Sequence, residues 1–318
     1  MKYYLDFEEP LRLYDEEIHL KKTMMDPSVE ITKEVAILIE KRLKKINEIH
    51  VSLSRWQRVQ LARHPDRPYS KDYIDIIFTD FVELHGDRLF GDDPAVICGI
   101  AKLDHKKVVI IAQQKGRNTK DNLYRNFGMM RPEGYRKALR IMKLAEKFNL
   151  PVITFMDTPG AFPGIGAEER GQGEAIARNL LEMSSLKVPI ISIVIGEGAS
   201  GGALGIGVCD RFLMMQNTWY SVISPEGCAS ILFRDATKAE EAAEALKVTP
   251  DDLVKMGICD KIIKEPNGGA HRDIKSSSIN LKSSILSKIK ELENIDPLSF
   301  IDHRIQKYDN LGVYEDLK

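Results

Sequence analysis

Residues Ile190 to Gly207 read Ile-Ile-Ser-Ile-Val-Ile-Gly-Glu-Gly-Ala-Ser-Gly-Gly-Ala-Leu-Gly-Ile-Gly. The first six residues are β-branched apart from Ser192, and they lack polar alternation, as is typical of a strand buried on both faces of a helix-covered sheet. Six of the following twelve residues are glycine. Because glycine has no Cβ, such a turn brings backbone N–H groups close to a ligand. The stretch therefore predicts an α/β fold whose buried strand stops at Gly196, beside a site for an anion or oxyanion.

The glycines of this stretch match one nucleotide-binding motif in part. Gly196, Gly198 and Gly201 fit the dinucleotide fingerprint G-x-G-x-x-G, which also requires a full helix and an acidic residue about 20 positions further on. Asp210 interrupts the helical pattern early, and Ser221 stands near the position of the acid. The sequence therefore disfavours dinucleotide binding.

A second motif, G-x-S-x-G, would make Ser200 a nucleophile between strand and helix. A serine hydrolase of this kind needs an acid and then a histidine downstream, where only His271 and His303 occur. A phosphate-binding loop is excluded, because no lysine follows the glycines. A serine hydrolase that uses Ser200 stays open as an alternative function.

A third interpretation requires the least of the surrounding sequence. The backbone N–H groups of Gly201 and Gly202 would form an oxyanion hole, without any side-chain nucleophile. A purely structural role stays open for any single glycine, because small residues also let a helix pack closely on a sheet.

A second glycine-rich turn begins at Asp157, directly after a predicted strand at residues 152–156. It continues through Gly160 and Pro163 into a predicted helix that ends near Ser185. With the glycines at its helical end, the two turns hold 11 of the 22 glycines of the chain. This clustering favours two functional turns over scattered loop glycines.

The composition excludes several classes of protein. The 318 residues are 43% hydrophobic, which is ample for a buried core, and the net charge of −1 gives no general attraction to nucleic acid or to an anionic membrane. The four cysteines lie too far apart for paired zinc ligands or a redox C-x-x-C motif, so we expect no metal in this chain. The acidic N-terminus lacks signal-peptide features, and no apolar run approaches the roughly 18 residues of a membrane span. A cytoplasmic location follows as the expectation.

The apolar pattern divides the chain into three parts. Residues 1–70 are predicted to form an N-terminal helical extension, with an irregular charged segment to about residue 25 and an amphipathic helix from Ser28 to Ile46 whose pattern resumes at residues 51–63. Residues 71–265 are the predicted core, which opens with a helix at residues 69–84 and a strand hairpin formed by 95–103 and 107–114. Residues 266–318 are a predicted linker, a helix at 280–294 and a polar tail.

Ordered motifs across residues 30–265 indicate a family. They are Phe81-Val82-Glu83-Leu84-His85-Gly86-Asp87-Arg88, Asn126-Phe127-Gly128-Met129, Pro132-Glu133-Gly134-Tyr135-Arg136-Lys137-Ala138, Asp157-Thr158-Pro159-Gly160-Ala161, Pro163-Gly164, Ala167-Glu168-Glu169-Arg170-Gly171-Gln172 and Gly201-Gly202-Ala203-Leu204. With them the chain resembles the alpha subunits of bacterial and plastid acetyl-coenzyme A carboxylase carboxyltransferases, members of the crotonase superfamily. The resemblance implies an α/β, crotonase-like (ClpP/crotonase) spiral of ββα units.

The resemblance also implies a function and its partners. The family transfers a carboxyl group from carboxybiotin, held on a biotin carboxyl carrier protein, to acetyl-CoA, and so gives malonyl-CoA for fatty acid biosynthesis. A homologous beta subunit with a zinc ribbon supplies the acyl-CoA half of the site, and two alpha and two beta chains form a heterotetramer. A biotin carboxylase component uses the ATP. A non-catalytic scaffold that assembles an enzyme complex through the N-terminal helices stays open as an alternative.

The site residues implied by the resemblance lie in the two glycine-rich turns. The N–H groups of Gly201 and Gly202 are expected to bind the oxyanion of biotin, and the biotin anion itself can take the methyl proton of acetyl-CoA, so no histidine base is required. Phe162 stands where the family commonly has a tyrosine, which keeps the ring and removes the hydroxyl group. The expected wall of the carboxybiotin pocket consists of Gly160, Ala161, Phe162, Pro163, Gly164 and Gly166.

Overall fold

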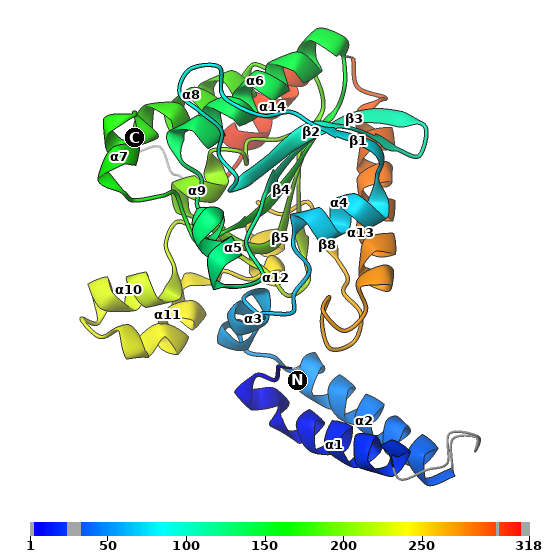
Figure 1. The fold of residues 1–318 in the computed structure, drawn as a ribbon. Coiled ribbons are helices and arrows are strands. Elements are labelled where there is room, and N and C mark those ends of the chain that lie inside the picture. The colour runs from blue at the N-terminus through cyan, green and yellow to red at the C-terminus, as the bar shows by residue number, and fades with distance from the viewer. Residues whose placement is uncertain (1–2, 24–32, 297–298, 313–318) are drawn as a thin grey trace, which may run out of the picture.

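A computed structural model describes residues 3–23, 33–296 and 299–312 (Figure 1). Its centre is an eight-stranded sheet in the order β1-β2-β3-β4-β5-β6-β8, and β7 pairs with β5 beyond the end of β6. The strands are β1 (Thr79–Glu83), β2 (Val96–Leu103), β3 (Lys106–Gln113), β4 (Val152–Thr158), β5 (Ile190–Ala199), β6 (Arg211–Met215), β7 (Trp219–Ser221) and β8 (Lys261–Ile263).

Helices cover both faces of the sheet and continue beyond its edges. The longer helices are α1 (Glu9–Thr23), α2 (Lys33–Val51), α3 (Arg55–Ala62), α4 (Ser70–Ile77), α6 (Pro132–Phe148), α8 (Gln172–Ser184), α10 (Pro225–Leu232), α11 (Ala239–Leu246), α13 (Ile274–Leu292) and α14 (Phe300–Asp309). The short ones are α5 (Thr119–Tyr124), α7 (Ile165–Glu169), α9 (Ser200–Leu204) and α12 (Pro250–Lys255), with 3-10 turns η1 (Asp6–Glu8), η2 (Asn126–Gly128) and η3 (Ala236–Lys238). Among the described helices, none is long and apolar enough to cross a membrane.

The strand predicted from the opening stretch is the centre of the sheet. Every residue of β5 is buried, and its neighbours β4 and β6 run parallel to it. Helices α6 and α8 cover one face of the sheet, and α4 and α13 cover the other. The prediction that the strand stops at Gly196 is wrong, because Gly198 still pairs with Thr158 on one side and Tyr220 on the other. Paired backbone groups on both sides keep the strand extended to Ala199.

The predicted hairpin of β2 and β3 is confirmed, and the helix predicted at residues 69–84 is half wrong. Helix α4 ends at Ile77, and residues 79–83 form β1, which pairs antiparallel with β2. The edge of β2 presents backbone N–H and C=O groups, which can form hydrogen bonds with a neighbouring strand but not with a helix. Tertiary pairing therefore overrides the helical spacing of the apolar residues.

Helices α1 and α2 form an antiparallel hairpin that projects from the core (Figure 1). The prediction of an irregular segment up to residue 25 is wrong, because α1 packs against α2 through buried Leu11 and Ile18. Its charged residues are satisfied within the hairpin, as in the 2.8 Å ion pair of Arg42 with Asp15. The predicted helix start at residues 28–32, with Val29, lies outside the described residues. The helical pattern predicted at residues 51–63 is interrupted before Ser54, which caps the separate helix α3.

The segments before and after the core are fastened to the sheet by buried arginines. Arg67 donates to the carbonyl oxygen of Ile195 at 2.8 Å and forms a bidentate pair with Glu265. The division of the chain at residue 70 stays a prediction. Helix α3, which precedes this boundary, packs on strands β5 and β7 of the core sheet. In the predicted polar tail, α14 carries the buried Arg304, which binds both carboxylate oxygens of Asp210.

Two histidines, the buried His64 and the half-buried His271, lie where the hairpin meets the core. The rings of His64 and His271 stack at 3.9 Å with 16° between their planes, near Glu8, Asp66 and Arg272. Burial is the main cause that lowers the pKa of both imidazoles, and the positive charges around His271 help to bring its pKa to about 3. The folded protein therefore keeps them neutral at a pH where unfolded histidine takes up a proton.

This difference predicts a loss of stability in mild acid. Unfolded imidazole titrates near pH 6.5, so the free energy of unfolding falls as pH drops below that value, by about 2 kcal/mol between pH 7 and 5 for a group such as His271. In urea unfolding at both pH values, His271→Gln should lose less stability than the wild type. The exposed His105→Gln variant is the control, and an equal loss in all three proteins would contradict the assignment.

Candidate active site

The two glycine-rich turns meet at the carboxyl ends of neighbouring parallel strands. β4 leads into the turn that begins at Asp157, and β5 leads through Gly198 into α9. A Cβ atom built on Gly202 would lie 2.2 Å from the carbonyl carbon of Gly160. Gly160 itself has φ of +152°, a backbone conformation that favours glycine. The approach of the turns therefore depends on the missing side chain of Gly202.

The first turn of α9 presents its N–H groups at this meeting point. Ser200 has φ of +56°, so the chain turns sharply from β5 into the helix. Within the described residues, the N–H groups of Gly201 and Gly202 have no acceptor, as is usual at the start of a helix. A Cβ atom on Gly201 would meet only Ile176, at 3.6 Å, and one on Gly160 would meet nothing within 4 Å. The backbone of both turns thus borders open space.

The outer part of the turn from Asp157 is built around Phe162. Its N–H donates to the carbonyl oxygen of Met130 at 3.1 Å, and the guanidinium of Arg131 lies 4.7 Å from the centre of its ring. A side chain at Gly164 would collide with the ring of Phe162, because a Cβ atom there would lie 2.4 Å from the ring. Of the six predicted pocket residues, Gly160 is buried, Pro163 is exposed, and Ala161, Phe162, Gly164 and Gly166 are intermediate.

A buried charge cluster lies beneath the two turns. The ammonium of Lys115 lies 2.7 Å from a carboxylate oxygen of both Asp157 and Glu197, and Arg63 pairs with Glu197 at 2.6 Å. Burial alone would lower the pKa of Lys115, but the two carboxylates raise it above its usual range. Burial would likewise raise the pKa of Glu197, but Lys115 and Arg63 bring it below its ordinary value. Lys115 and Glu197 therefore stay charged, and neither serves as a base near neutral pH.

Several residues that hold the site were not singled out from the sequence. They are Glu197 of the charge cluster, and Gln113, Tyr135 and Asn179, whose side chains bond to α9 or to Gly205 at its end. A signal existed at Gln113-Gln114-Lys115, where polar residues end an apolar strand. In α/β proteins, ligands bind outside the carboxyl ends of the parallel strands, so polar residues at the end of an apolar strand indicate a candidate ligand site. Tyr135 lies in the family motif at residues 132–138, but no sequence signal distinguishes Asn179 from other helix residues.

Ser200 is exposed at the start of α9, and its positive φ is compatible with a nucleophile elbow. No histidine in the described part of the chain bonds to it. His271, one of the two downstream candidates, stacks on His64, and His303 bonds to the carbonyl oxygen of Ser299. The geometry therefore provides no base for Ser200.

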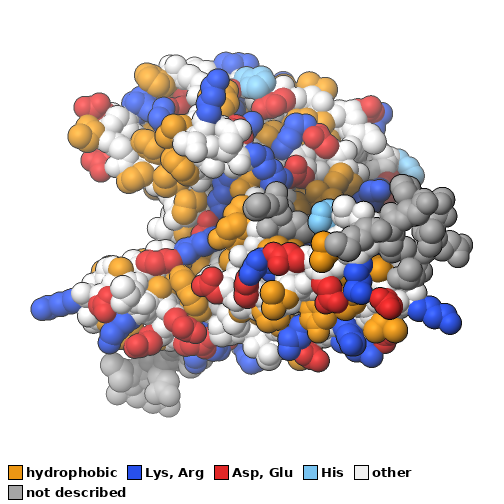
Figure 2. Space-filling view, turned by 60° about the horizontal axis from the view of Figure 1, so that its bottom comes forward, with side chains coloured by type: hydrophobic (Ala, Val, Ile, Leu, Met, Phe, Trp, Pro, Cys, Tyr) orange, Lys and Arg blue, Asp and Glu red, His pale blue; other side chains and the backbone are white. Residues whose placement is uncertain are grey.

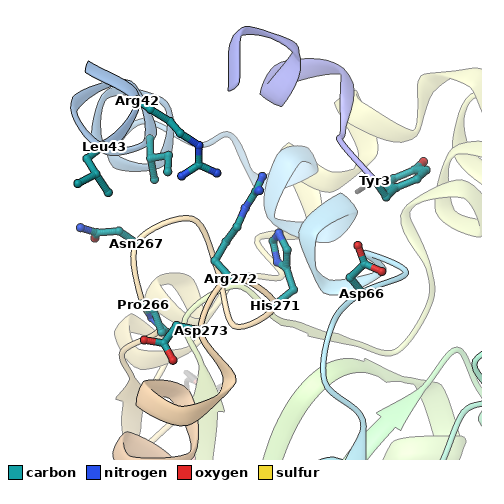
Figure 3. Close-up of a pocket in the computed structure, with 10 residues that line it drawn as sticks. Tyr3, Arg42, Leu43, Asp66, Pro266, Asn267, His271, Arg272 and Asp273 are labelled. Carbon is teal, nitrogen blue, oxygen red and sulfur yellow. The ribbon is translucent and has the colours of Figure 1, made fainter. Parts of the chain in front are cut away.

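Another cavity lies at the junction of the hairpin and the core (Figure 3). It has a volume of about 440 Å³ between α2 and the loop at residues 266–273, and its lining includes no residue of the two glycine-rich turns. Its arginines are already paired, Arg42 with Asp15 and Arg272 with Glu8. We therefore place the candidate active site at the turns, not in this cavity.

One group among the described residues brings three possible metal ligands together, namely Glu8, His64 and His271, with ligand atoms within 4.8 Å of one another. A metal ion lies in the plane of each imidazole that binds it. The stacked, nearly parallel rings cannot both meet this condition, and Arg272 already donates to Glu8 at 2.7 Å. The arrangement fits packed neutral rings better than a metal site.

The parallel sheet, the two facing turns and the free N–H groups define a crotonase-like α/β enzyme. The model of the family "Acetyl co-enzyme A carboxylase carboxyltransferase-like" matches residues 4–312. The chain belongs to this family. It is 54% identical to the acetyl-coenzyme A carboxylase carboxyl transferase subunit alpha of Chlorobaculum parvum, over 99% of this chain and 98% of that protein. The alpha subunit of Campylobacter jejuni subsp. doylei is 53% identical, over 99% and 100%.

Solved structures support the fold. The chain superposes on transcarboxylase 12S with a TM-score of 0.54 and 22% identity, over 69% of this chain and 42% of that one. It superposes on a chain of a Pseudomonas malonate decarboxylase hetero-tetramer with a TM-score of 0.56 and 14% identity, over 68% and 86%. The predicted crotonase-like fold, the predicted family and the prediction of a carboxyltransferase are thereby confirmed.

The contact of the turns predicts unequal effects of two neighbouring substitutions. Gly202→Ala places a methyl group against Gly160 and should lower the free energy of unfolding by about 1–3 kcal/mol, as overpacking does. Gly201→Ala faces open space and should change it by less than about 0.5 kcal/mol. Denaturant unfolding of both variants measures the difference, and equal losses would contradict the close approach.

Proposed function

We propose that this chain is the biotin-binding half of a carboxyltransferase that moves a carboxyl group from carboxybiotin to acetyl-CoA, giving malonyl-CoA for fatty acid biosynthesis. The observation that carries the proposal is that, within the described residues, the N–H groups of Gly201 and Gly202 have no acceptor where the two turns meet, beside Gly160, on which a Cβ atom would meet nothing within 4 Å. The names of the most similar relatives support the choice of acetyl-CoA as the acceptor.

The N–H groups suit a negative charge that develops on an oxygen atom. When bound, carboxybiotin would supply the carboxyl group as CO2, its ureido group would take the methyl proton of acetyl-CoA, and the methyl carbon would bond to CO2 to give malonyl-CoA. Gly201 and Gly202 donate to the ureido oxygen at this stage, and one donor of this kind is typically worth about 2.7–4 kcal/mol. The proposed wall beside this oxygen consists of the buried Gly160, the half-exposed Ala161, Phe162, Gly164 and Gly166, and the exposed Pro163.

The side chains around the turns support a mechanism without a protein base. Lys115 is held as a cation between Asp157 and Glu197, and Ser200 has no histidine partner in the described chain. The groups that remain for catalysis are neutral backbone donors, which act on charge in the transition state. This agrees with proton removal by the ureido anion.

Exposed apolar side chains around the turns support a partner chain. The residues Ile165 on α7, Leu204 on α9, Val222 just after β7 and Ile231 on α10 are all exposed. Figure 2 shows hydrophobic side chains along a notch in one side of the molecule. Apolar surface of this kind is typical of protein interfaces. We propose that a homologous beta subunit with a zinc ribbon covers it and supplies the acyl-CoA half of the site.

The remaining components of the proposed reaction lie on other chains. Carboxybiotin is carried on a biotin carboxyl carrier protein, and the biotin carboxylase component uses ATP to load it. The proposed assembly has two alpha and two beta chains. Its cytoplasmic location remains a prediction of the sequence.

The shared site predicts activity only in the assembled enzyme. In the reverse reaction, malonyl-CoA should carboxylate a free biotin analogue when this chain is co-expressed with a beta subunit, and not when it is purified alone. Acetyl-CoA release measures turnover. Turnover by this chain alone would contradict a shared site, and no turnover by a verified complex would contradict the proposed function.

The role of the backbone donors predicts a mild effect of Ser200→Ala. Because the oxyanion hole uses N–H groups, the assembled variant should keep turnover within about tenfold of the wild type, whereas loss of a catalytic nucleophile costs on the order of 10⁶-fold. The same reverse reaction measures it. Near-complete loss with an intact complex would favour the hydrolase alternative. Unchanged turnover after Gly201→Trp and Gly202→Trp, with assembly intact, would favour the scaffold.

A further inference from the structure

The carbonyl group of Gly202 is held by side chains and not by the helix to which it belongs. Helix α9 ends at Leu204, and the N–H of Ile206, which would bond to Gly202 in a longer helix, donates to Ala203 at 3.2 Å. The carbonyl oxygen of Gly202 instead accepts from Nε2 of Gln113 at 2.7 Å and from the hydroxyl of Tyr135 at 3.2 Å. Two buried donors thus replace one backbone bond.

Gln113 connects the two glycine-rich turns through one side-chain amide. It is the last residue of β3 and is completely buried. While its Nε2 donates to Gly202, its Oε1 accepts from the N–H of Asp157 at 3.1 Å, where the other turn begins. A buried amide that satisfies both its donor and its acceptor in this way has little freedom to rotate. The side chain of Gln113 therefore bridges the two turns and sets the distance between them.

Tyr135 is the second side chain that holds α9. It comes from α6, and a Cβ atom on Gly205 would lie 2.6 Å from its ring, so ring and helix are in close contact. Asn179 of α8 donates to the carbonyl oxygens of both Tyr135 and Gly205, at 3.1 and 2.9 Å. The position of Tyr135 is thus fixed by its own helix α6 and by Asn179 of α8, and its hydroxyl bonds to Gly202.

We propose that Gln113 and Tyr135 are positioning residues for the oxyanion hole. By holding the carbonyl group of Gly202, they fix the orientation of the first turn of α9, and with it the direction of the N–H groups of Gly201 and Gly202. This inference rests on the proposed function, in which those N–H groups bind the ureido oxygen. Neither side chain needs to touch a substrate for this role.

Two tyrosines of the chain allow a matched test. Tyr135 and Tyr73 are both completely buried, and each hydroxyl has one hydrogen bond, to Gly202 at 3.2 Å and to Ser277 at 3.3 Å. Tyr135→Phe and Tyr73→Phe each remove one hydroxyl with little change of volume. Gln113→Met removes the amide of the other donor at similar length. All three are assayed as complexes with the beta subunit, in the reverse reaction with malonyl-CoA and a biotin analogue.

The expected result is a loss of turnover without a loss of acyl-CoA binding. Misplacement of catalytic groups by a distant change can cost up to about 100-fold, so we expect kcat to fall about 3- to 10-fold in Tyr135→Phe and about 10- to 100-fold in Gln113→Met. KM for malonyl-CoA should stay within about twofold, because these donors act on transition-state charge alone. Tyr73→Phe should keep the kcat of the wild type.

The inference is overturned if Tyr135→Phe keeps the kcat of the wild type, or if Tyr73→Phe loses as much. It is also overturned if KM for malonyl-CoA rises in place of a fall in kcat. The folded fraction of each variant is measured by circular dichroism, so that kcat refers to folded complex. A wild-type complex without turnover would instead overturn the proposed function and this inference with it.

Discussion

The approach of Gly202 to the carbonyl group of Gly160 is the constraint on which the site depends. A Cβ atom at Gly202 would lie 2.2 Å from that carbon, so only a hydrogen atom fits between the turns. The approach is possible because β4 and β5 are parallel neighbours, which brings both turns to the same edge of the sheet. The glycine at position 202 follows from this constraint, because a larger residue there would push the turns apart.

Buried ion pairs connect the outlying segments to this central sheet. Arg67 pairs with Glu265 and Arg304 with Asp210, and all four side chains are at least nine-tenths buried. Burial of two charges costs free energy that the pair recovers only with good geometry and further hydrogen bonds. Both arginines meet this condition, since each also donates to backbone carbonyl oxygens, such as that of Ile195. These pairs therefore specify where the flanking segments dock.

The sequence predicted the parts of the fold that local pattern determines. The apolar runs of β2, β3 and β5 and the family motifs were recognisable without coordinates. Parts that depend on distant partners were not, such as β1, which exists because it pairs with β2, and α14, which docks through Arg304. The glycines of the site were recognisable, but the bond from Gln113 to Gly202 spans 89 residues and no local pattern contains it.

The electrostatics of the site support the proposal that glycines are its catalytic groups. In the charge cluster, Lys115 lies between Asp157 and Glu197, and Arg63 pairs with Glu197, so the two cations and two carboxylates cancel. An unpaired cation would bind the ureido oxygen in the ground state as well as in the transition state and would so gain little rate. Fixed N–H dipoles respond chiefly to charge that develops during the reaction, provided that the backbone cannot reorient. In the proposed mechanism, rigidity of α9 is therefore as important as the N–H groups themselves.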